Sequence, residues 1–144
     1  MATFSDSEIE RHWHIWQMYR DGAVALIHRE TILNQIIAEL EDAGYLIHIC
    51  DAKHGDKIAF EKTLRSILDF PAGRPDQTNL DALNDYLGDL EFPGCTGIVV
   101  VARHVQELHE RDAPYLYNVM DIFAITSWTS LPNNHDIISA LGIV

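Results

Sequence analysis

Residues 97–102 read Gly-Ile-Val-Val-Val-Ala, and this short apolar run is the strongest indicator of the fold. Four consecutive β-branched side chains leave no polar face, which is typical of a strand that is covered on both sides of a sheet. Such strands belong mostly to parallel sheets, because the crossover connections place helices on both faces. The run therefore predicts a buried strand in an α/β protein.

Outward from this run, predicted strands and helices alternate along the chain. Helix 30–43 ends at Gly44, a residue suited to a C-terminal cap, and the next helix ends at Phe70-Pro71. The alternation predicts a small, mostly parallel sheet covered by helices. The other predicted strands are Ala23–Ile27, Tyr45–Cys50 and Asp136–Leu141, and the later helices are Asn79–Leu90 and Ala113–Thr129.

Residues 1–22 are predicted to form an N-terminal extension, and residues 23–144 a single domain. Trp13, Trp16 and Tyr19 crowd together before the turn signal Arg20-Asp21-Gly22, which favours a hairpin strand, although residues 8–18 also fit a short helix. The aromatic cluster fits a small satellite core, and alternatively part of a binding surface.

Composition restricts the class of partner. The 144 residues contain 47% hydrophobic side chains and carry a net charge of −12. So acidic a surface repels phosphate backbones, which argues against nucleic-acid binding, and it attracts basic proteins. Solubility alone is the alternative explanation of the charge.

The chain is also expected to be cytoplasmic and to make no contact with a membrane. No signal peptide is visible, and no run reaches the about 18 apolar residues of a membrane span. Cys50 and Cys95 form no C-x-x-C pair and are expected to be buried free thiols in a reducing compartment.

A search for catalytic chemistry finds no complete constellation. The chain has eight histidines, among them His12, His14, His104 and His109, but no carboxylate or cysteine completes a metal set at a recognised spacing. No G-x-S-x-G, P-loop or G-x-G-x-x-G motif occurs. The sequence therefore predicts no enzyme, no metal site and no cofactor.

The helix predicted over residues 79–90 has two contrasting faces. Leucines and Tyr86 share one face, whereas Asp81, Asp85 and Asp89 line the other at i, i+4 and i+8. Asn79 suits the N-cap, and the helix dipole favours Asp81. Asp85 and Asp89 gain no such benefit and repel each other. The row is explained if these exposed carboxylates bind guanidinium or ammonium groups of a partner. The alternative is an ordinary helix face exposed to solvent.

Several segments together resemble the barstar-like family, from about residue 23 to the C-terminus. They are Gly44-Tyr45 before a strand, Asp56-Lys57 and Phe60 opening the helix that Phe70-Pro71 closes, and above all Asn79-Leu80-Asp81-Ala82-Leu83-Asn84-Asp85. The resemblance implies a three-layer α/β fold. It also implies an intracellular, immunity-type protein, monomeric when free, that occludes the active site of a basic secreted or toxin-type ribonuclease.

The resemblance also assigns a partner-binding site. It places principal acidic contacts at Asp81 and Asp85, a contact at Asn84 where the family can carry a tryptophan, and the helix start at Asn79. The rest of the predicted site comprises Asp76, Gln77 and Thr78 in the preceding loop, and Gly88.

The chain departs from the family at two places. Arg74-Pro75-Asp76-Gln77-Thr78 replaces a shorter aromatic-glycine loop, and Ile125 or a neighbour falls where a contacting glutamate is usual. A different ribonuclease surface, or another basic protein or toxin bound by the same fold, therefore remains an alternative.

Overall fold

A computed structural model describes residues 23–143 except 54, 92–93, 95–96 and 131–135. Within these residues, four parallel strands form one sheet in the order β1-β4-β3-β2, and so confirm the predicted α/β fold. The strands are β1 (Val24–Ile27), β2 (Leu46–Asp51), β3 (Gly97–Arg103) and β4 (Asp136–Gly142). β2 is therefore an edge strand, although it precedes the central β3 in the chain.

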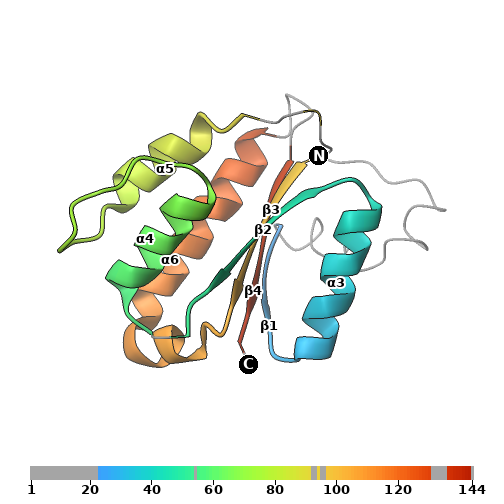
Figure 1. Ribbon diagram of the computed structural model, residues 1–144, viewed down its shortest axis with the longest axis horizontal. Coiled ribbons are helices and arrows are strands. Elements are labelled where there is room, and N and C mark those ends of the chain that lie inside the picture. Colours follow the sequence, from blue (N-terminus) through green and yellow to red (C-terminus); the bar gives the residue numbers. More distant parts are fainter. Residues whose placement is uncertain (1–22, 54, 92–93, 95–96, 131–135, 144) are drawn as a thin grey trace.

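Helices cover both faces of the sheet and give three layers (Figure 1). Of the described helices, α3 (Glu30–Asp42) packs on one face. Helices α4 (Lys57–Ile67), α5 (Leu80–Gly88) and α6 (Gln106–Ser130) pack together on the other. No helix in the described part of the chain is long and apolar enough to cross a membrane.

The position of strand β3 between two layers of helices explains why its sequence has no polar face. Val100 and Ala102 pack into the core under α4, α5 and α6, whereas Val99 and Val101 pack against α3. Alternate side chains of one strand point to opposite faces, so both sets must be apolar when helices cover both faces.

Local signals fix two helix ends as predicted. Gly44 follows α3 with a φ of 87°, and the Tyr45 N–H donates to the Leu40 carbonyl at 3.0 Å. This left-handed residue closes the helix in the geometry that glycine adopts without steric cost. Asp56 opens α4, where its side chain accepts from the Ile58 N–H at 3.0 Å.

Two helix boundaries differ from the prediction. Helix α5 ends at Gly88, with Asp89 as its C-cap, so Leu90 lies beyond the helix. Helix α6 begins at Gln106 instead of near Ala113, because a helical segment precedes a kink at Asp112, whose φ is −150°. The Asp112 carboxylate accepts from the Tyr115 N–H at 3.2 Å and so caps the second segment, which was the part predicted.

Cys50 is a buried free thiol, as expected. Its pKa is raised to about 12, mainly by burial and further by the charge of Asp51. Cys95 and the aromatic cluster of the N-terminal extension lie outside the described residues.

Candidate functional site

The acidic row consists of Asp81, Asp85 and Asp89, and all three side chains are exposed. Leu83 and Leu87, on the opposite side of α5, are only 0% and 1% exposed in the core. Burial of these leucines sets the rotation of the helix about its axis and so turns the carboxylates outward. None of the ion pairs among the described residues involves the row.

The other predicted contacts on α5 share this exposed side. Asn84 and Gly88 are exposed and lie one turn apart, next to Asp81 and Asp85. A Cβ added to Gly88 would meet no atom within 4 Å, so this position opens onto free space. We call Asp81, Asn84, Asp85, Gly88 and Asp89 the acidic face.

Asn79 has a structural role at the start of α5. Its Oδ1 accepts from the Ala82 N–H at 3.0 Å, which confirms the predicted N-cap. The cap satisfies one of the N–H groups that a helix start leaves without a partner. A direct contact between Asn79 and a partner protein stays a prediction.

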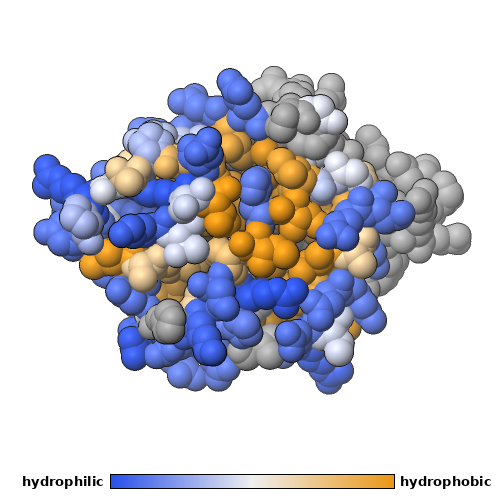
Figure 2. Space-filling model, in the orientation of Figure 1, coloured by the Kyte–Doolittle hydropathy of each residue, from blue (hydrophilic) through white to orange (hydrophobic). Residues whose placement is uncertain are grey.

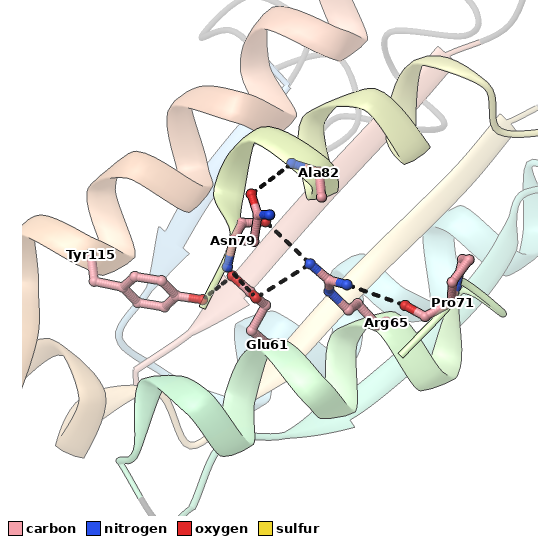
Figure 3. A network of polar contacts seen from close by, with 6 residues as sticks. All are labelled: Glu61, Arg65, Pro71, Asn79, Ala82 and Tyr115. Atoms are coloured by element: carbon pink, nitrogen blue, oxygen red, sulfur yellow. Dashed lines mark hydrogen bonds and ion pairs between the residues drawn. The ribbon is translucent and has the colours of Figure 1, made fainter. Parts of the chain in front are cut away.

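A buried ion pair on α4 holds the start of α5 in place (Figure 3). Glu61 and Arg65 are each 4% exposed, and their charged groups lie 3.6 Å apart. Glu61 Oε2 accepts from the Asn79 N–H at 2.8 Å, while Arg65 Nη2 donates to the Asn79 carbonyl at 3.2 Å. Arg65 Nη1 also donates to the Pro71 carbonyl at 3.2 Å. The pair therefore forms hydrogen bonds with both ends of the loop 71–79 that leads into α5.

Tyr115 ties the same pair to α6. Its hydroxyl donates to Glu61 Oε1 at 3.2 Å, and burial raises the pKa of Tyr115, so the phenol stays protonated. The Arg65 guanidinium also lies 5.7 Å from the centre of the Tyr86 ring on α5. Glu61, Arg65 and Tyr115 thus join three helices, and we call this cluster the clamp.

Sequence reasoning missed the clamp. The only sequence signal was the i, i+4 spacing of Glu61 and Arg65, which is equally typical of an exposed helical ion pair. Both charges are buried because the loop 71–79 and α6 pack over them. These segments are distant from α4 in the sequence, so the local pattern does not predict the burial.

The loop before α5 presents predicted contacts to solvent and packs against the clamp. Asp76 and Gln77 are exposed and Thr78 is half-buried. Gln77 also lines a cavity of about 190 Å³ between the loop and α4. At Gly73, an added Cβ would lie 2.7 Å from Arg65 Nη1, so glycine lets the chain approach the guanidinium closely.

Two of the histidines form side-chain pairs at other places in the described structure. His104 Nδ1 lies 3.0 Å from Asp51 Oδ1, and this hydrogen bond is the main cause that lowers the pKa of Asp51. His109 contacts the Tyr117 hydroxyl at 2.8 Å. Within the described ranges, no three His, Cys, Asp or Glu side chains converge on a possible metal position.

Comparison with known proteins gives a family but no individual relative. The family described as Barstar (barnase inhibitor) matches residues 44–137, which run from the start of β2 into β4 and include the loop, α5 and the clamp. No curated protein and no solved structure matches the chain. The match spans well over half of the chain and contains the whole acidic face, so the chain belongs to the barstar family of ribonuclease inhibitors.

Proposed function

We propose that this protein is a non-catalytic cytoplasmic inhibitor that binds a basic ribonuclease, of the secreted or toxin type, and occludes its active site. In this proposal α5 and the loop before it enter the cleft that binds RNA phosphates. The observation that carries the proposal is the acidic face: its exposed carboxylates form no ion pair among the described residues, and the clamp holds the start of the helix that carries them. Membership of an inhibitor family supports it.

The chemistry of the acidic face suits such a target. A ribonuclease cleft must present cations to phosphate oxygens, and carboxylates can replace those oxygens in hydrogen bonds with guanidinium groups. Aspartate side chains are short, so little side-chain entropy is lost when they bind. The clamp restricts the loop before binding, which lowers the ordering cost of association.

Charge complementarity of this kind sets association rate and specificity more strongly than total affinity. The barnase–barstar pair is one of the complexes on which that generalisation rests. We therefore expect Asp81 and Asp85 to be the principal contacts, with Asn84, Gly88 and residues 76–79 around them.

A second candidate is the same fold bound to another basic protein or toxin. Two observations favour it: the loop 74–78 lacks the aromatic-glycine sequence usual in the family, and Ile125 is 61% exposed where a charged contact is usual. Either feature changes the surface that a partner must match.

Inhibition of purified ribonucleases tests the proposal. The panel contains barnase, other basic secreted ribonucleases, and any ribonuclease encoded beside the gene of this protein. We expect stoichiometric inhibition of RNA cleavage by at least one of them, and its loss in the double variant Asp81→Ala and Asp85→Ala. The matched control removes two exposed carboxylates from other helices, Glu41→Gln and Glu110→Gln, and should inhibit as the native protein does.

Two outcomes would contradict this function. Absence of inhibition across the panel would favour the second candidate. Full inhibition by the double aspartate variant would show that the acidic face is not the binding surface.

A further inference from the structure

A groove lies beside α5, between the C-terminal ends of α4 and α5 and the start of β2. Its volume is about 480 Å³. Apolar side chains line it from several segments, among them Leu46 from β2, Phe70 from the chain after α4, and Leu90 from the chain after α5. Figure 2 shows apolar side chains gathered over the centre of this face of the molecule, with hydrophilic side chains around them.

The β2 side of the groove is open because β2 ends the sheet. Leu46 is 38% exposed and Ile49, which points to the opposite face of the sheet, is 47% exposed. Edge strands usually carry charges or proline that discourage contact with other chains, and these two positions carry large apolar side chains instead. Leu46 therefore leaves apolar surface available in the groove.

Three carboxylates surround the apolar part of the groove: Asp69, Asp89 and Glu91. All are exposed, and none takes part in the ion pairs found among the described residues. No lysine or arginine appears among the described lining residues. His48 also lines the groove, and burial lowers its pKa, so the imidazole is neutral at pH 7. The groove thus combines an apolar wall with net negative charge.

The groove is continuous with the acidic face. Asp89 belongs to both, as the last carboxylate of the row and as part of the groove. Tyr86 follows Asp85 directly, lines the groove, and packs against Phe70 with 5.5 Å between ring centres. A protein seated on the acidic face therefore reaches the groove without crossing an intervening element.

We propose that this groove binds a cationic segment of the same basic partner. A lysine or arginine places its aliphatic stem on Leu46 and Leu90 and its charged group among the carboxylates. This side chain fits because it is apolar along its length and cationic at its end. The proposal rests on the proposed function for its partner, and it extends the interface from α5 to the edge of the sheet.

A peptide titration tests the groove without any ribonuclease. The probe is a hexapeptide of alternating arginine and leucine, and the control peptide carries glutamate in place of arginine. In nitrogen-15 NMR spectra, we expect the amide signals of Leu46, His48 and Leu90 to shift saturably with the arginine peptide only. The Glu91→Gln variant should bind it about threefold more weakly, as expected for one exposed ion pair.

The matched control for this charge change is Glu41→Gln on α3, across the sheet from the groove, which should leave peptide binding unchanged. Asp69→Asn gives an independent second test, because asparagine tolerates the φ of 58° at this position. Signals that do not move, or equal weakening by Glu91→Gln and Glu41→Gln, would overturn the proposal.

Inhibition assays then compare two substitutions on one strand. Leu46→Thr removes apolar surface inside the groove, whereas Ile49→Thr removes it on the other face of β2. Threonine is β-branched and favours strands, so both variants should fold, which circular dichroism checks. Against the ribonuclease that native protein inhibits best, Leu46→Thr should weaken inhibition about tenfold, as burial of part of a leucine implies, and Ile49→Thr should not.

The outcomes separate the two proposals. If the Asp85→Ala variant loses inhibition and Leu46→Thr keeps it, the acidic face binds the enzyme and the groove proposal is wrong. If no ribonuclease is inhibited, the proposed function is wrong, and the peptide titration still decides whether the groove binds cationic segments.

Discussion

Asp85 lies between Asp81 and Asp89 on the exposed side of α5, beyond the first turn, and it takes part in none of the ion pairs among the described residues. It repels a like charge one turn away in each direction, and no helix-end effect compensates it. We therefore expect Asp85→Asn to stabilise the free protein by about 0.5 kcal/mol while it sharply weakens inhibition. Urea unfolding and a ribonuclease assay on the same preparations measure the two effects.

Asp81→Asn is the control for that experiment. Asp81 lies in the first turn of α5, where the helix dipole favours its charge, so its removal should stabilise the protein less. If Asp85→Asn instead destabilises the fold by more than about 1 kcal/mol, Asp85 holds the structure together and is not a free binding group.

Cys50 illustrates how burial controls reactivity. Its thiol reacts as the thiolate, and a pKa raised to about 12 keeps it protonated at pH 8. In a Cys95→Ser variant, we expect a thiol reagent to label Cys50 only as fast as the protein unfolds, and at once in urea. Immediate stoichiometric labelling of the native protein would contradict this.

The raised pKa of Cys50 also has a consequence for stability. Because the folded pKa exceeds the ordinary value of 9.0, the group contributes stability below pH 9.0 that is lost as the pH rises toward about 12.

Among the elements, α5 depends most on its neighbours, because its entry is fixed by the clamp. Glu61→Gln keeps one acceptor oxygen for the Asn79 N–H, and its amide nitrogen can donate to the Tyr115 hydroxyl, but it leaves the Arg65 charge buried without a counter-ion. Loss of one partner from a buried pair costs several kcal/mol, and we expect about 3 kcal/mol of unfolding free energy. Thermal or urea denaturation measures this directly.

A double variant separates stability from positioning at the same element. Adding Arg65→Met to Glu61→Gln removes the uncompensated charge, so part of the stability should return. Inhibition should not return, because the methionine cannot bind the carbonyls of Pro71 and Asn79 and the loop is no longer held. Recovery of both properties together would show that the clamp only stabilises the fold.

For the whole molecule, the net charge of −12 has a kinetic consequence. An acidic inhibitor attracts a basic enzyme over distances that salt screens, and the Debye length falls from about 10 Å at about 0.1 M to about 3 Å at about 1 M salt. We expect the association rate constant to fall about tenfold or more over this range, with a smaller change in dissociation. Stopped-flow mixing with the inhibited ribonuclease measures both; an association rate independent of salt would contradict electrostatic steering.

Several features of this protein follow from its sequence because they depend on near neighbours in the chain. The apolar run Gly97–Ala102 predicts a strand covered on both faces, since side chains alternate along any strand. Gly44 and Asn79 predict helix ends through backbone geometry and capping within a few residues. The acidic row follows from helical periodicity, and its exposure is confirmed once the leucines opposite are buried.

Only the tertiary structure decided which distant residues meet. Glu61 binds the Asn79 N–H from 18 positions away and the Tyr115 hydroxyl from 54 positions away, and no local pattern specifies such pairs. The strand order β1-β4-β3-β2 places β2 at the edge, which exposes Leu46 and opens the groove beside α5. Both depend on how strands and helices assemble around one core, because packing of the whole chain determines which charges are buried and which apolar side chains remain uncovered.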